Sequence, residues 1–179
     1  MKLYKRLAII VGIGLIGGIL VVELPHAARI AHDPLVVEMS DIDLAKNADQ
    51  VVSGTITKKL NTVREVGADG EDMVYTRWQV RTTRTVKGTH GQTVNVRIPG
   101  GRYLSTIVEV EDQPDFSVGQ SVMLFLGKRD DWKGDYRLVG EFQGAFRLEG
   151  TGVSQEAVQS ETGRRVKASV LEQVAIDSK

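Results

Sequence analysis

Few residues in this chain have the types and spacing that chemistry needs. Three histidines and no cysteine occur among 179 residues, which excludes disulfides, thiolate metal sites and a cysteine nucleophile. His26, His32 and Asp33 lie close together in sequence, but two histidines without a clear third partner are typical of solvated residues. His90 lies in a glycine-flanked turn, which predicts an exposed residue and not the base of a Ser-His-Asp triad.

Carboxylates are more numerous, but their clusters fall in predicted loops, where acids favour solubility. A calcium loop is not predicted at 69–72, because the regular alternating acids of a known calcium loop are missing. The sequence therefore predicts a protein that is not an enzyme and has no catalytic residues, no metal site and no cofactor. The loop acids are Glu109, Glu111, Asp112, Asp115, Asp130 and Asp131.

One glycine pattern resembles a cofactor site. Residues 12–17 form G-x-G-x-x-G after an apolar run, and Glu38 follows at about the place of a ribose-binding acid, as in Rossmann dehydrogenases. A Rossmann helix needs a polar face, whereas residues 18–22 are apolar all round and Pro25 would break the helix after barely two turns. A Rossmann-type NAD-binding oxidoreductase is therefore a disfavoured alternative.

The N-terminus has the pattern of a membrane segment. Three basic residues precede residues 7–22, sixteen positions without a charge or a side-chain hydrogen-bonding group. A cleaved signal peptide needs small residues at −1 and −3, and no convincing site offers both. We therefore predict that residues 1–24 are a retained transmembrane anchor, and a signal peptide released from a secreted or periplasmic binding domain is the alternative. The basic end predicts an N-terminus inside the cytoplasmic membrane and a periplasmic C-terminal domain.

Small residues recur within this segment at helical spacing. Gly14 and Gly18 form G-x-x-x-G, and Ala8 with Gly12 forms a second small pair on a neighbouring helix face. Such notches let another transmembrane helix approach closely, which predicts other membrane subunits and the lipid bilayer as partners. Glycines are also common in membrane helices in general, so both interpretations stay open.

Composition favours one ordinary globular domain behind this segment. The chain is 41% hydrophobic and 26% charged, with enough length for a single core. Basic and acidic residues both number 23, and the body is slightly acidic once the basic residues of the leader are set aside. A nucleic-acid binder would show a basic excess to neutralise phosphates, so no nucleic-acid partner is predicted.

The body is organised around residues 73–88, the longest two-residue alternation in the sequence. One side carries Val74, Trp78 and Val80 and the other carries polar residues, which predicts a long strand with one face on a core. Short β-like runs follow, and residues 121–126, which are apolar on both faces, predict the most buried strand. This pattern indicates a mainly β fold, a small barrel or a sandwich.

Three short motifs carry a family resemblance. They comprise Ala48, Asp49, Val52 and Gly54, then Val86, Lys87 and Gly88, and finally Phe116, Gly119, Val122, Leu124 and Leu126. Together they resemble the netrin-like module, the OB-type barrel of tissue inhibitors of metalloproteases. The resemblance implies a small OB-like antiparallel β-barrel. It carries over no inhibitory residue, because those inhibitors chelate zinc with an N-terminal cysteine and this chain has none.

Four segments follow from these patterns: an anchor over 1–24, a juxtamembrane linker over 25–46, an OB-like barrel over 47–150, and a C-terminal hairpin and helix over 151–179. In the last segment, residues 157–159 are predicted to pair with 165–167. Ser169 and Glu172 fit a capping box for the final helix. Its predicted apolar stripe comprises Val170, Leu171, Val174 and Ile176.

Two surfaces are candidates for partner binding. Arg77 and Arg81, with Lys87 beyond them, form a cationic stripe on the polar face of the long strand, which suits an acidic partner or lipid head groups. A solvated sheet face is the alternative. Trp132, at a charged hairpin tip, either inserts into a partner or folds back over the barrel. The sequence thus predicts a non-catalytic, membrane-anchored interaction module, an accessory or structural subunit of a larger membrane complex such as an electron-transfer or photosynthetic one.

Overall fold

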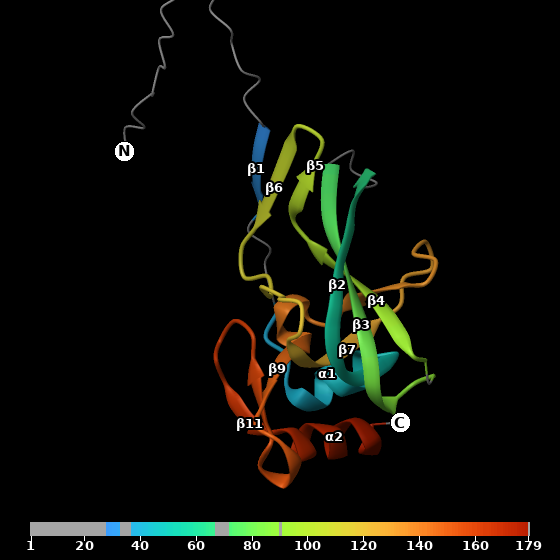
Figure 1. Cartoon of the computed structure of the whole chain (residues 1–179), viewed down its shortest axis with the longest axis vertical. Helices are drawn as coiled ribbons and strands as arrows, with labels where there is room; N and C mark the ends of the chain where they lie inside the picture. Colours follow the sequence, from blue (N-terminus) through green and yellow to red (C-terminus); the bar gives the residue numbers. More distant parts are fainter. Residues whose placement is uncertain (1–27, 33–36, 67–71, 90, 179) are drawn as a thin grey trace, which may run out of the picture.

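The computed structural model describes residues 28–32, 37–66, 72–89 and 91–178. These residues form a mainly β fold with two α-helices (Figure 1). The elements are β1 (Ala28–His32), α1 (Asp41–Asn47), β2 (Gln50–Val66), β3 (Asp72–Lys87), β4 (Thr93–Pro99), β5 (Gly101–Tyr103), β6 (Thr106–Val110), β7 (Ser121–Gly127), β8 (Asp135–Leu138), the 3-10 turn η1 (Glu141–Gly144), β9 (Ala145–Glu149), the 3-10 turn η2 (Gly152–Ser154), β10 (Glu156–Gln159), β11 (Arg165–Lys167) and α2 (Ala168–Asp177).

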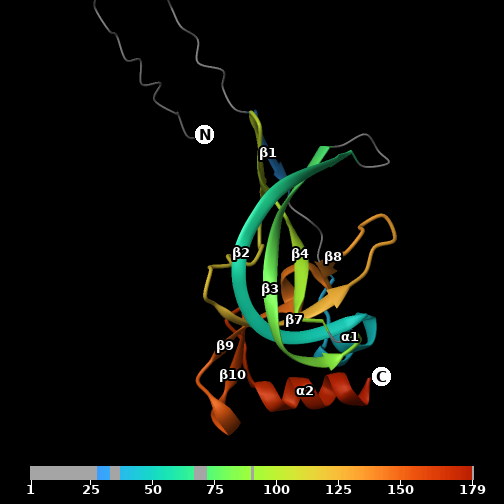
Figure 2. The ribbon, with the colours of Figure 1, turned by 45° about the vertical axis from the view of Figure 1, so that its right-hand side comes forward.

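Five strands close into a ring in the order β7-β2-β3-β4-β8, and β8 pairs back onto β7. All of its pairings are antiparallel except the one between β4 and β8. Strands β9, β10 and β11 extend the sheet outward from β7, and β1, β6 and β5 form a separate three-stranded sheet. Figure 2 shows β2 curving strongly, so that its first half pairs with β7 while its second half extends away with β3.

The two strongest strand predictions are confirmed. Along β3, burial alternates as expected, with Val74, Thr76, Trp78 and Val80 on the buried face. Every residue of β7 after its first is buried. Both strands contribute to two cores. The core inside the ring contains Ile56, Trp78 and Leu124, and the core between the ring and the helices contains Val86, Phe125, Phe146 and Leu171.

The C-terminal segment agrees with the sequence in part. The predicted hairpin forms, with Ala157 opposite Val166. The predicted capping box does not form, because α2 begins at Ala168 with Lys167 at the N-cap and no side-chain cap. Glu172 instead pairs with Arg84 of β3 at 2.7 Å. Leu171 is buried and Val174 packs against the core, but Val170 and Ile176 of the predicted stripe are exposed, and Ala168 and Ala175 are buried in their place.

The predicted linker contains a strand and a short helix. Residues 28–32 form β1, which pairs with β6, and 41–47 form α1 with a capping box between Ser40 and Asp43. The predicted anchor, residues 1–24, lies outside the described residues. Within the described part of the chain, no helix is long and apolar enough to span a membrane.

Gly54 lies at an irregularity in the β2–β3 pairing. A Cβ atom there would lie 2.3 Å from the backbone oxygen of Arg81. We expect Gly54→Ala to lower the free energy of unfolding by about 1–3 kcal/mol, because the backbone must shift to admit the methyl group. The matched control is Gly91→Ala, whose Cβ would make an ordinary 3.7 Å contact. Equal denaturation midpoints for the two variants would contradict the close approach.

Candidate binding site

The candidate site is built around Trp132, in the turn between β7 and β8. The Trp132 side chain folds back against the ring, and the residue is 5% exposed. The guanidinium groups of Arg97 and Arg129 lie 4.4 Å and 4.6 Å from its ring centroid, and Tyr75 meets it edge-on at 5.0 Å. Of the two placements that the sequence left open, the structure therefore has the one in which Trp132 packs over the strands.

A network of ion pairs around Asp135 holds Arg97, which stacks on the Trp132 ring. Asp135, at the start of β8, has a side chain that is 1% exposed. It accepts hydrogen bonds from Arg77 at 2.8 Å and from Arg97 at 2.6 Å. Burial alone would raise the pKa of Asp135, but the hydrogen bonds from the two arginines outweigh it and hold that pKa below its usual value. Asp135 is therefore ionised at neutral pH, between two guanidinium groups.

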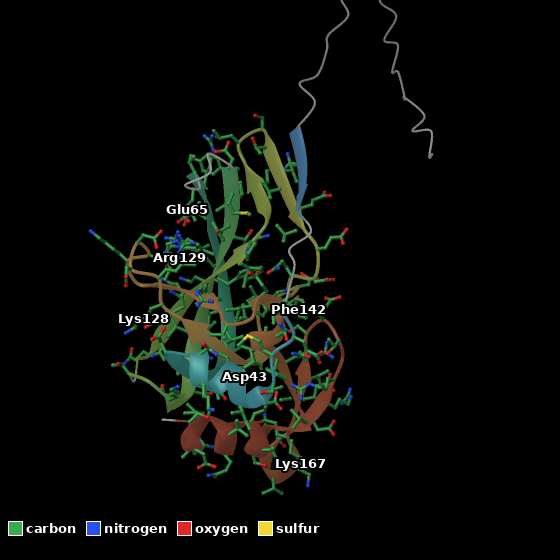
Figure 3. The ribbon with its side chains drawn as sticks, turned by 180° about the vertical axis from the view of Figure 1, so that it is seen from behind. Asp43, Glu65, Lys128, Arg129, Phe142 and Lys167 are labelled. Carbon is green, nitrogen blue, oxygen red and sulfur yellow. The ribbon has the colours of Figure 1, made fainter. Side chains whose placement is uncertain are left out.

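Glu65 connects the ion network to the aromatic cluster. Its carboxylate accepts a hydrogen bond from the Trp132 indole at 3.1 Å and a second from Arg97. Glu65 lies near the end of β2, Arg97 is on β4 and Trp132 follows β7, so three separated parts of the chain meet here. Figure 3 shows Glu65 and Arg129 on the same side of the molecule.

A small cavity of about 120 Å³ opens beside this cluster. Three arginines and one glutamate are among its lining residues, so the charge facing the cavity is net positive. Arg97 and Arg129 already pair with carboxylates, whereas Arg137 is exposed and, among the residues that the structure describes, donates only a long 3.4 Å hydrogen bond to the Leu138 carbonyl. Burial raises the pKa of Tyr75 on another wall, so its hydroxyl stays neutral. These groups suit a single carboxylate. The charged lining residues are Arg97, Arg129, Arg137 and Glu141.

The predicted cationic stripe divides into three different environments. Arg77 belongs to the Asp135 network, and its other amino group donates to Asn61 at 3.1 Å. Lys87 donates to the carbonyl of Ala45 at 2.7 Å, in the last turn of α1, where a cation complements the helix dipole. Arg81 is exposed on the polar face of β3. Partner binding by these residues stays a prediction, and Ala8, Gly12, Gly14 and Gly18 lie outside the described residues.

The sequence did not identify Glu65, Arg97 and Asp135 of the ion network, nor Tyr75, Arg129 and Arg137 beside Trp132. Arg97 occupies a polar position in the alternation of β4, and Asp135 opens a strand, so each was visible only as an ordinary polar residue. Their pairing depends on the contact between β4 and β8, which are distant in sequence. No local signal identifies such a contact.

No protein-family model matches the chain, and no curated protein matches it. Among the described residues, no group of three or more His, Cys, Asp or Glu side chains is arranged to hold a metal ion. The site is a cavity lined by three arginines and one glutamate, beside the cluster of Trp132, Tyr75 and the ion pairs of Glu65 and Asp135.

Proposed function

We propose that this protein is a non-catalytic, membrane-anchored interaction module, an accessory or structural subunit of a larger membrane complex. Residues 1–24 hold it in the cytoplasmic membrane, and its β-rich domain faces the periplasm. The observation that carries the proposal is the arginine-lined cavity beside Trp132, because it offers one incompletely paired guanidinium group, that of Arg137, on a preorganised support. The sixteen-residue apolar run at 7–22 supports the membrane location.

We further propose that the five-stranded ring is a small OB-like β-barrel. Its strand number, closure through β7–β8 and mostly antiparallel pairing support this. OB-folds bind ligands on the face of their second and third strands, between the loops that follow the first and fourth strands. In this ring the corresponding parts are β3 and β4, the end of β2 and the turn after β7. Tyr75, Arg97, Glu65 and Trp132 occupy these parts.

The ligand that fits this cavity is an acidic side chain of a partner protein. A volume of about 120 Å³ admits a carboxylate and little else. The Arg137 guanidinium can offer two parallel N–H groups to a carboxylate, and Trp132 beside it supplies the aromatic contact that interface centres favour. The bound carboxylate would pair with Arg137, as the carboxylates of Asp135 and Glu65 already pair with Arg77 and Arg97.

The test compares two arginine variants in the full-length chain. Arg137→Ala removes a cation from the cavity, and Arg81→Ala removes an exposed cation from the polar face of β3. After extraction in mild detergent, we expect Arg137→Ala to weaken partner retention about tenfold or more, since a hydrogen bond to a charged group contributes about 1.5–3 kcal/mol. Arg81→Ala is expected to retain the partner. The opposite pattern would move the site to the strand face, and unchanged retention in both would refute the cavity as the contact.

A further inference from the structure

The turn between β5 and β6 combines two unfavourable features in one residue. Leu104 is 83% exposed, and its φ of 52° lies in the left-handed region that favours glycine or asparagine. A large apolar side chain in that position gains nothing from the fold itself. Arg102, which is exposed, and Tyr103, which is half-buried, immediately precede it.

This turn lies beside the point where the N-terminal segment joins the domain. Strand β1 runs parallel to β6, and Ala28, the first residue of β1, lies opposite Thr106. Thr106 is two residues after Leu104, so β1 begins next to the turn. Five residues lie between Val22, the end of the apolar run, and Ala28, so the six Cα–Cα steps between them span at most about 20 Å when fully extended. The turn is therefore held close to whatever surface the apolar run enters.

The fold holds this turn firmly at one end of the molecule. The Thr62 hydroxyl on β2 donates to the Arg102 carbonyl at 2.7 Å, and the Thr76 hydroxyl on β3 donates to the Gly100 carbonyl at 2.8 Å. Figures 1 and 2 show β1 and the far part of β2 at the end opposite α2, and Figure 1 places β5 and β6 there as well. The position of Leu104 is thus set by the long β2–β3 hairpin.

We propose that the β5–β6 turn is a second membrane contact, which inserts Leu104 into the interfacial region of the bilayer. Tyr103 suits the head-group level, where an aromatic body meets a polar hydroxyl, and Arg102 suits the lipid phosphates. The proposal rests on the membrane anchoring proposed above. Two contacts, the anchor and the turn, orient the domain so that α2 points away from the membrane and the Trp132 cavity faces sideways, toward neighbouring membrane subunits.

The absence of cysteine permits a direct test. The full-length chain carrying Leu104→Cys is labelled with an environment-sensitive nitrobenzoxadiazole probe and reconstituted in vesicles of phosphatidylcholine and phosphatidylglycerol. The control is Val153→Cys with the same label, because Val153 is 95% exposed in η2, and Gln155 just after η2 hydrogen-bonds to the first residue of α2. Probe emission and its quenching by nitroxide lipids are measured at both positions.

We expect the probe at position 104 to emit at shorter wavelength and to be quenched at least threefold more than the probe at position 153. Equal, solvent-like signals from a chain that still floats with the vesicles would overturn the second contact and leave the anchor intact. A chain that does not float with the vesicles at all would overturn both the anchor and the contact. Because the same apolar probe is used at both positions, its own affinity for lipid cancels in the comparison.

Discussion

Replacing Asp135 with asparagine is expected to lower the free energy of unfolding by about 3–5 kcal/mol at neutral pH. The substitution keeps the shape of the side chain and removes its charge. Arg77 and Arg97, whose hydrogen bonds to Asp135 are 2.8 Å and 2.6 Å long, would then face each other with no carboxylate between them. Chemical denaturation measures the loss. A value below about 1 kcal/mol would mean that Asp135 does not neutralise the two arginines.

The matched control is Asp131→Asn, four residues earlier in the same hairpin. Asp131 also pairs with an arginine, Arg129 at 2.7 Å, but its side chain is 60% exposed, so we expect a much smaller change than at Asp135. The pH dependence gives a second check on Asp135. Its pKa is lower in the folded chain than its ordinary value of 3.8, so its stabilising effect is complete above that value and is lost as the pH falls through the lower folded value. The stability difference between wild type and Asp135→Asn should therefore shrink below about pH 4.

Trp132→Ala is expected to cost about 3–5 kcal/mol, the range for truncating a buried tryptophan. The substitution removes the ring against which Arg97 and Arg129 stack and the edge contact with Tyr75. It also leaves Glu65 without the indole donor. Thermal and chemical denaturation of the full-length chain measure the effect, and the variant should also weaken retention of the proposed partner.

Trp132→Phe separates the two contributions within this residue. Phenylalanine keeps an aromatic face for the arginines but has no N–H group for Glu65, so we expect a smaller loss of about 1–3 kcal/mol. If the alanine and phenylalanine variants are both as stable as wild type, Trp132 is not packed over the strands. In that case its role would be the partner insertion that the sequence also allowed.

Sequence periodicity predicted those strands whose own pattern of apolar and polar residues shows which side chains are buried. The alternation in β3 and the continuous apolar run of β7 each fix the burial of a strand by local pattern alone. The second half of β2 carries no such pattern, because Lys58 and Lys59 are adjacent and Arg64 and Glu65 follow. Nothing in this segment itself indicates a strand, yet β3 pairs with it as far as Val66. The second half of β2 is therefore a strand because it pairs with β3, and its own residue pattern does not indicate one.

The candidate site was less predictable than the strands. Trp132 was identified from its type, but its neighbours Asp130, Asp131 and Lys133 are charged and indicate only a solvated tip. The residues that bury it, Arg97 and Glu65, are 35 and 67 positions away in the chain. Their meeting follows from the closure of the ring, through the parallel pairing of β4 with β8. A contact of this kind is decided by topology, which the local sequence does not encode.

We propose that a retained membrane segment carries this domain into an assembly. The most direct test is native mass spectrometry of the protein extracted from its membranes in mild detergent, with release of the intact chain in the same experiment. We predict a released chain of 19.6 kDa, with residues 1–24 still attached, from a particle that contains integral membrane subunits. A shortened chain that is recovered alone, as a monomer and without detergent, would contradict the account.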